Sequence, residues 1–139
     1  MVIYTTLMQV SGNAINEETA FMSKRILIAE DDQFTREMLV TAATMRGYDV
    51  ISVPNGVELL TIATDETFDV VITDLMMPDL DGASATEIMR LQGNTTPVIV
   101  MTGLSHNDLR LVGTKFNKIF HKPLNISELF DFVESLPGK

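Results

Sequence analysis

The chain has 139 residues, of which 45% are hydrophobic and 21% are charged, a balance typical of one globular domain with a real core. Its formal net charge of −9 argues against a nucleic-acid-binding surface, because nucleic-acid phosphates would repel it. The lack of cysteine excludes disulfide and thiol chemistry and suits a reducing cytoplasm, which is the expected location. No apolar run approaches the roughly 20 residues of a membrane-spanning helix.

Residues 1–23 differ in composition from the rest of the chain. Residues 1–10 are mildly apolar but lack the basic start and cleavage site of a signal peptide, and a polar stretch without periodicity follows. Met22 then leads directly into an apolar strand, as a natural protein start often does. We expect residues 1–23 to be a disordered tail or a start codon assigned too early. The alternative is an extra helix or strand that docks on the domain or on a neighbour.

From Arg25 onward, short apolar strands alternate with helical patterns, and we interpret residues 24–136 as one domain with a tail at 137–139. Strands are expected at 26–29, 49–53, 70–74, 97–101 and 118–121. Helices are expected at 33–46, at 55–64 with Asn55 as its cap, at 83–91 and 105–112, and after Asn125. Strict alternation implies a parallel sheet with helices on both faces, an α/β three-layer sandwich with right-handed crossovers.

Three of the expected helices have apolar residues at helical spacing. These sets are Phe34, Met38, Ala42 and Met45; Ile88 and Leu91; and Ile126, Leu129, Phe130 and Val133. Gly47 is well placed to end the first of these helices. Asn125 and Glu128 have the spacing of a capping box at the start of the last one.

Polar side chains follow four of the expected strands. Glu30 and Asp31 follow the first strand, Asp74 ends the third, Thr102 ends the fourth and Lys122 follows the fifth. Parallel strands bring these ends to the edge of the sheet where ligands bind in open α/β folds. Each residue alone is a weak signal, because acids at strand ends are often only helix caps, as we expect Asp32 to be.

Taken together, these groups indicate one kind of chemistry. Crowded carboxylates are costly unless protons or a cation neutralise them, and an all-oxygen set of ligands suits Mg²⁺. A carboxylate nucleophile, a Mg²⁺ site, a hydroxyl donor and a lysine together are typical of phosphoryl transfer to an aspartate. The sequence therefore predicts Asp74 as the centre of a phosphoryl-transfer site.

Four motifs in this order resemble the receiver domain of response regulators, of the single-domain, chemotaxis-regulator type. The motifs are Ile-Leu-Ile-Ala-Glu-Asp-Asp at 26–32, Asp-Leu-Met-Met-Pro-Asp-Leu-Asp-Gly at 74–82, Val-Met-Thr-Gly at 100–103 and Lys-Pro at 122–123. The resemblance covers residues 24 to about 136. It implies a flavodoxin-like (βα)5 fold with a five-stranded parallel sheet of order 2-1-3-4-5.

The resemblance also implies a role for each matching position. Asp74 would accept a phosphoryl group from a phosphohistidine on a sensor kinase. Glu30 and Asp31, with Asp74 and the backbone carbonyl of Met76, would hold Mg²⁺. Lys122 would bind the phosphoryl oxygens. Such a domain is not an enzyme in the ordinary sense, because it catalyses only its own phosphorylation and dephosphorylation.

The same resemblance implies that Thr102 would hydrogen-bond the phosphoryl group and move on activation. Two departures from the family pattern stand out. The family more often has two aspartates where this chain has Glu30 and Asp31, although the longer side chain should still reach a cation. Ile119 occupies the position of the usual switch aromatic, and strand alternation should point Phe120 to the opposite face.

Three functions stay open. The leading one is a stand-alone phosphoreceiver that takes its phosphoryl group from a sensor histidine kinase and then binds an unknown protein partner. The second is a phosphorelay intermediate that passes the group to a histidine phosphotransfer protein. The third is a Mg²⁺-dependent phosphatase, which needs a second acid; Asp79 and Asp81 are discounted because they lie in a turn after Pro78. Dimerisation through the last strands and helices, which this family often uses, is also left open.

Overall fold

The computed structural model describes residues 23–105 and 116–137. The extension at 1–22 and nearly all of the helix expected at 105–112 lie outside the described residues. None of the helices within the two described ranges combines the length and apolar character needed to cross a bilayer.

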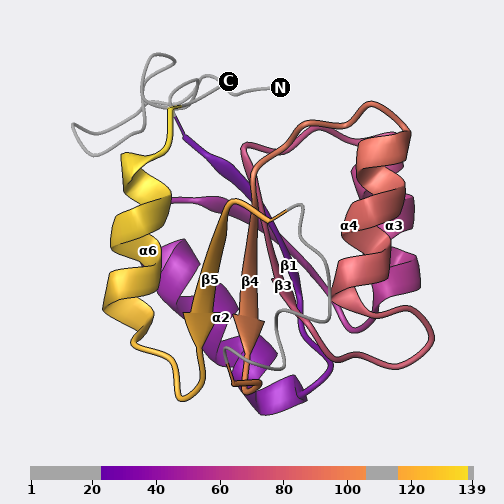
Figure 1. Ribbon diagram of the computed structural model, residues 1–139. Helices are drawn as coiled ribbons and strands as arrows, with labels where there is room; N and C mark the ends of the chain where they lie inside the picture. The colour runs from indigo at the N-terminus through magenta and orange to yellow at the C-terminus, as the bar shows by residue number, and fades with distance from the viewer. Residues whose placement is uncertain (1–22, 106–115, 138–139) are drawn as a thin grey trace.

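Five parallel strands form one sheet in the order β2-β1-β3-β4-β5, which confirms the expected topology (Figure 1). The strands are β1 (Arg25–Ala29), β2 (Asp49–Val53), β3 (Val70–Asp74), β4 (Val98–Thr102) and β5 (Lys118–His121). The described helices are α2 (Gln33–Met45), α3 (Gly56–Asp65), α4 (Gly82–Leu91) and α6 (Ile126–Ser135). Helices α2 and α6 pack on one face of the sheet, and α3 and α4 pack on the other.

The central strands β3 and β4 are buried over their whole length, because helices cover both of their faces. This burial explains their continuous apolar sequence. Val71 packs in the α3–α4 layer and Ile72 in the α2–α6 layer, as strand alternation requires. The register pairs Ala29 of β1 with Thr73 of β3, so the residues that follow these two partners reach the carboxyl edge together.

The helix starts agree with the caps expected from the sequence. Asp32, Asn55 and Asn125 each accept a hydrogen bond from a backbone N–H three residues later, at 2.8, 2.9 and 3.1 Å. Gly47 has a φ of +87° just after α2, a conformation that glycine adopts without steric cost. The local chemistry of these residues therefore sets where the elements begin and end.

The buried face of α2 is not the one that the apolar pattern suggested. Phe34, Met38 and Met45 are 72%, 43% and 82% exposed, whereas Leu39 and Ala43 are fully buried against the sheet. Both sets have helical spacing, so periodicity correctly predicts a helix here. Periodicity does not decide which of two apolar stripes faces the sheet.

Helices α6 and α4 differ in whether the apolar residues noted in the sequence are buried. Leu129, Phe130 and Val133 of α6 are buried as expected. In α4, by contrast, Leu91 is 80% exposed and Met89 is fully buried, so Met89 rather than Leu91 contributes to the core. Leu91 is the last residue of α4.

A matched pair of leucine substitutions tests this assignment of faces. We expect Leu39→Ala to lower the free energy of unfolding by about 2–5 kcal/mol, because the truncation leaves a cavity in the core. Leu91→Ala, the same change at an exposed position, should stay within about 0.5 kcal/mol of wild type. Urea denaturation measures both, and an equal loss for the two variants would contradict the assignment.

Candidate functional site

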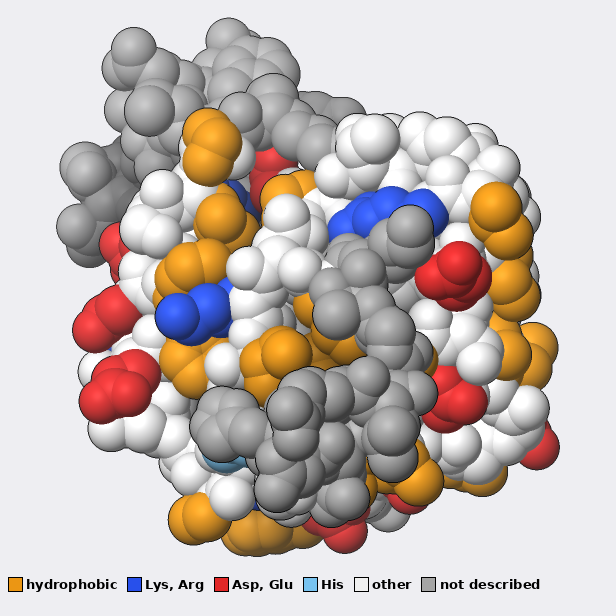
Figure 2. Space-filling model, in the orientation of Figure 1, with side chains coloured by type: hydrophobic (Ala, Val, Ile, Leu, Met, Phe, Trp, Pro, Cys, Tyr) orange, Lys and Arg blue, Asp and Glu red, His pale blue; other side chains and the backbone are white. Residues whose placement is uncertain are grey.

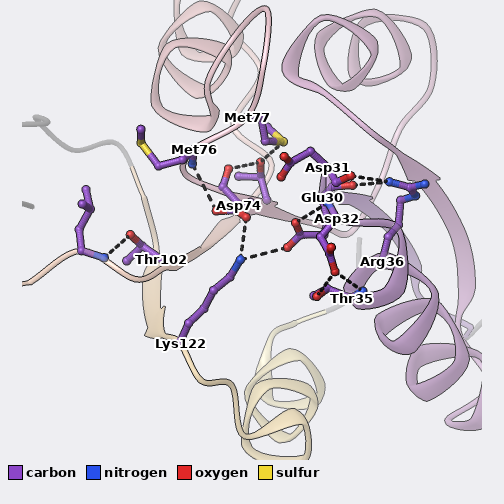
Figure 3. Close-up of polar contacts among 12 residues, drawn as sticks. Glu30, Asp31, Asp32, Thr35, Arg36, Asp74, Met76, Met77, Thr102 and Lys122 are labelled. Atoms are coloured by element: carbon purple, nitrogen blue, oxygen red, sulfur yellow. Dashed lines mark hydrogen bonds and ion pairs between the residues drawn. The ribbon is translucent and has the colours of Figure 1, made fainter.

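Side chains from three strand ends meet at the carboxyl edge of the sheet (Figure 3). Nζ of Lys122 lies 2.7 Å from Oδ2 of Asp74 and 3.3 Å from Oε1 of Glu30. Lys122 follows β5, Asp74 ends β3 and Glu30 follows β1. The parallel register produces this meeting, since it joins residues that are 48 and 92 positions apart in the chain.

Three carboxylates gather at this edge. Glu30, Asp31 and Asp74 each offer an oxygen, and these oxygens lie within 4.8 Å of one another. Glu30 is fully buried and Asp74 is 6% exposed, whereas Asp31 is open to solvent. Hard oxygen donors at this spacing, open on one side to water, fit the preference of Mg²⁺ for carboxylates plus retained waters. The expected metal-binding acids are therefore brought together.

The Glu30 carboxylate is held from two sides. Its Oε2 accepts a hydrogen bond from the backbone N–H of Asp32 at 3.0 Å, and its Oε1 faces Lys122. Burial raises the pKa of Glu30 to about 7, and the negative charge of Asp74 adds to this rise, while the Asp32 N–H and Lys122 oppose it. Glu30 therefore holds a proton more readily than an exposed glutamate does.

Lys122 remains a cation in this setting. Burial alone would lower its pKa, but its hydrogen bond to Asp74 and the charges of Asp74 and Glu30 outweigh that effect, so the pKa is raised. A fixed positive charge next to Asp74 favours any anionic group attached to that carboxylate.

The turn after β3 shapes the approach to Asp74. The backbone N–H of Met76 lies 3.2 Å from Oδ1 of Asp74 and donates to it, while the Met76 side chain is 63% exposed. That the Met76 carbonyl joins the metal ligands stays a prediction. Gly82 closes the turn, and a Cβ at this position would overlap the carbonyl oxygen of Asp74. Sequence reasoning saw only a turn here and missed this requirement for glycine.

Thr102 lies buried at the same edge, at the end of β4. Its Oγ1 accepts a hydrogen bond from the backbone N–H of Leu104 at 3.0 Å (Figure 3). In this state the hydroxyl therefore engages its own loop, and its phosphoryl-binding role stays a prediction. Ile119 packs in the α3–α4 layer and Phe120 in the α2–α6 layer, which confirms that they lie on opposite faces of β5.

Arg36 is a neighbour of the site that sequence reasoning missed. Its Nη1 donates to the backbone carbonyl of Glu30 at 2.7 Å (Figure 3). The guanidinium therefore braces the acidic loop, residues 30–32, against the first turns of α2. The available signal was its position four residues after the Asp32 cap, which places it one turn along the helix.

Comparison with known families supports the same interpretation. Residues 26–134 match the model of the response regulator receiver domain. A curated relative, the response regulator MprA of Mycobacterium bovis, is 32% identical over 117 residues, which cover 83% of this chain and 51% of MprA. The chain spans about half the length of the first curated relatives that it matches.

Solved structures show the same similarity. The receiver domain of the Francisella response regulator 1452 has a TM-score of 0.77 and 31% identity, covering 81% of this chain and 95% of its own. The Thermotoga maritima response regulator TrrA, solved with Mg²⁺ and BeF, has a TM-score of 0.75 and 29% identity, covering 82% of this chain and 99% of its own.

The raised pKa of Glu30 predicts a pH dependence of stability. The folded state holds the proton more tightly than the unfolded chain between the ordinary pKa of 4.5 and about 7. Without divalent cations, the free energy of unfolding should therefore fall as pH rises through this window, by at most about 3 kcal/mol. Urea denaturation in EDTA should show that Glu30→Gln flattens this slope. An unchanged slope in the variant would show that another group binds the proton.

Proposed function

The chain belongs to the response regulator receiver domain family of two-component signalling, and on that premise we propose that Asp74 is its phospho-acceptor. The observation that carries the proposal is the nearly buried Asp74 carboxylate, held by the Lys122 ammonium among two further acids. A sensor kinase phosphohistidine, or a histidine phosphotransfer protein, supplies the phosphoryl group.

In the transfer, an Asp74 carboxylate oxygen attacks phosphorus. An O–P bond forms, the P–N bond to the donor imidazole breaks, and the ring nitrogen keeps the bonding electron pair and takes up a proton from solvent. The product gains about −1.5 to −2 of charge at neutral pH. Lys122 is the cation within reach of this charge, so its ammonium shifts from the carboxylate toward the phosphoryl oxygens.

Mg²⁺ is the proposed cofactor, and it neutralises phosphoryl charge when bound. Glu30, Asp31 and Asp74 would hold it, together with the carbonyl of Met76. The compact all-oxygen set supports this assignment. The Mg²⁺ named for the TrrA complex supports it as well. Binding the cation requires Glu30 to be ionised, and this links occupancy to pH.

Thr102 carries the proposed response. Its hydroxyl turns from the Leu104 N–H toward the phosphoryl oxygens, which releases the hydrogen bond to Leu104. Ile119 is half-buried where a switch aromatic is usual, so the rearrangement proceeds without a large ring changing position. Phosphorylation of Asp74 thereby changes contacts at the carboxyl ends of β4 and β5.

We propose a downstream protein as the partner of the phosphorylated form, with the domain acting in the cytoplasm. A homodimer through β5 and α6 is part of this proposal. Figure 2 shows apolar side chains gathered on the face that β5 and α6 form. Phe120 and Phe132 lie there with ring centroids 6.1 Å apart and with Nζ of Lys118 5.8 and 5.5 Å from the two centroids. Light scattering with and without a phosphoryl analogue tests the dimer.

The alternatives have separate tests. Return of the phosphoryl group from Asp74 to a histidine phosphotransfer protein would identify a phosphorelay intermediate. Steady turnover of a phosphomonoester would identify a phosphatase. Asp81 weighs against the phosphatase, because it caps α4 by accepting from the Ser84 N–H at 2.7 Å. Asp79 lies in the turn with a φ of +70°.

The central test is phosphorylation by a small phosphodonor with Mg²⁺, followed by intact mass. We expect wild type to gain one phosphoryl group only when Mg²⁺ is present, and Asp74→Asn to gain none, because the amide is not a nucleophile. Asp79→Asn is the matched control, since asparagine tolerates the positive φ of that position, and it should react like wild type. Equal modification of Asp74→Asn would refute the proposal.

A second pair of variants tests the lysine. Lys122→Ala should slow phosphorylation roughly 10²-fold, because a preorganised charge is lost at the transferring group. Its Mg²⁺ affinity should be retained, since Lys122 is not a ligand. Lys118→Ala removes an exposed lysine of β5, the strand that Lys122 follows, and should react normally. Loss of Mg²⁺ binding in Lys122→Ala, measured by NMR titration, would contradict the role given to Lys122.

A further inference from the structure

Helix α2 presents an apolar groove on its outer side. The groove has a volume of about 440 Å³. It is lined by Phe34, Glu37, Met38, Thr41, Ala42 and Met45. Phe34 and Met45, at its two ends, are 72% and 82% exposed. Among residues 23–105 and 116–137, these are two of the most exposed large hydrophobic side chains, and they share one helix face. A contiguous apolar surface of this kind favours a docked partner.

We propose that residues 1–10 of the same chain dock in this α2 groove. Their sequence, Met-Val-Ile-Tyr-Thr-Thr-Leu-Met-Gln-Val, contains no charged side chain and is rich in large apolar residues. Seven of these ten residues are apolar, namely Met1, Val2, Ile3, Tyr4, Leu7, Met8 and Val10. The composition of this segment matches a groove in which Glu37 is the one charged lining residue.

The start of the described chain lies beside the groove. The Ser23 hydroxyl donates to the backbone carbonyl of Gly47 at 2.7 Å, and Gly47 is two residues beyond Met45. Ser23, which joins residues 11–22 to the described part of the chain, is thus held near the C-terminal end of α2. Twelve residues can span up to about 40 Å when extended. The 13-residue helix α2 is about 20 Å long, so the tether lets residues 1–10 reach its whole length.

Charge favours this occupant over a second copy of the protein. A second copy docked through the same groove would bring its own Glu37 toward Glu37, whereas residues 1–10 add no side-chain charge. The tether also holds the segment near the groove at an effective concentration of about a millimolar. An intramolecular contact therefore needs little intrinsic affinity to persist.

The absence of cysteine allows a direct test in the full chain. We would compare the double variants Met8→Cys with Met45→Cys and Met8→Cys with Leu91→Cys under mild oxidation. Leu91 is a matched control, because it is 80% exposed and ends its helix on the opposite face of the sheet. We expect the first pair to form an intramolecular disulfide roughly tenfold faster than the second, as local concentration dictates. Intact mass and non-reducing electrophoresis measure the two rates.

Two results would overturn the proposal. Equal rates for the two pairs would mean that residues 1–10 do not prefer the groove. A disulfide-linked dimer from the first pair would mean that a second copy occupies it. Adding Leu7→Asp to the first pair should slow its oxidation roughly tenfold, because an apolar contact is lost. Thr6→Asp adds the same charge at a polar position and should leave the rate unchanged; equal slowing by both would show that charge, not apolar docking, controls it.

Discussion

The structure depends on the compensation of buried negative charge at the carboxyl edge of the sheet. Glu30 and Asp74 are both nearly inaccessible to water, and the Lys122 ammonium lies between them. Removing one partner of such a buried set leaves an uncompensated charge, which is strongly destabilising. The parallel register of β1, β3 and β5 and the charge balance of this site therefore depend on each other.

The same constraint means that different positive groups can compensate the charge of the acids. The charge of the acids is met here by Lys122 and, for Glu30, by a proton held more tightly than usual. A divalent cation would be a third source of compensating charge. A phosphoryl group on Asp74 would change how the lysine, the proton and the cation share this role. Arg36 and Gly82 fix the backbone on either side of the site, so the site residues keep their positions when the compensating charge changes.

The helices contribute in two separate ways. Their buried faces, such as Leu39 and Ala43 of α2, support the strands that deliver the site. The outer face of α2 does not contribute to this core, yet it carries the exposed apolar side chains of Phe34, Met38 and Met45. The first of these residues lies two positions beyond the Asp32 cap, so whatever occupies the groove lies along the helix that begins at the acidic loop.

The sequence by itself determined the strands, the polar residues at their ends and most helix starts, because β-branched runs and caps such as Asp32 and Asn125 act locally. It also predicted which strand ends meet, since parallel strands share one edge. Only the tertiary structure decided which stripe of α2 is buried, that Thr102 bonds to Leu104, and that Gly82 must lack a side chain. Those features depend on contacts between packed layers, and local periodicity does not encode which surfaces meet.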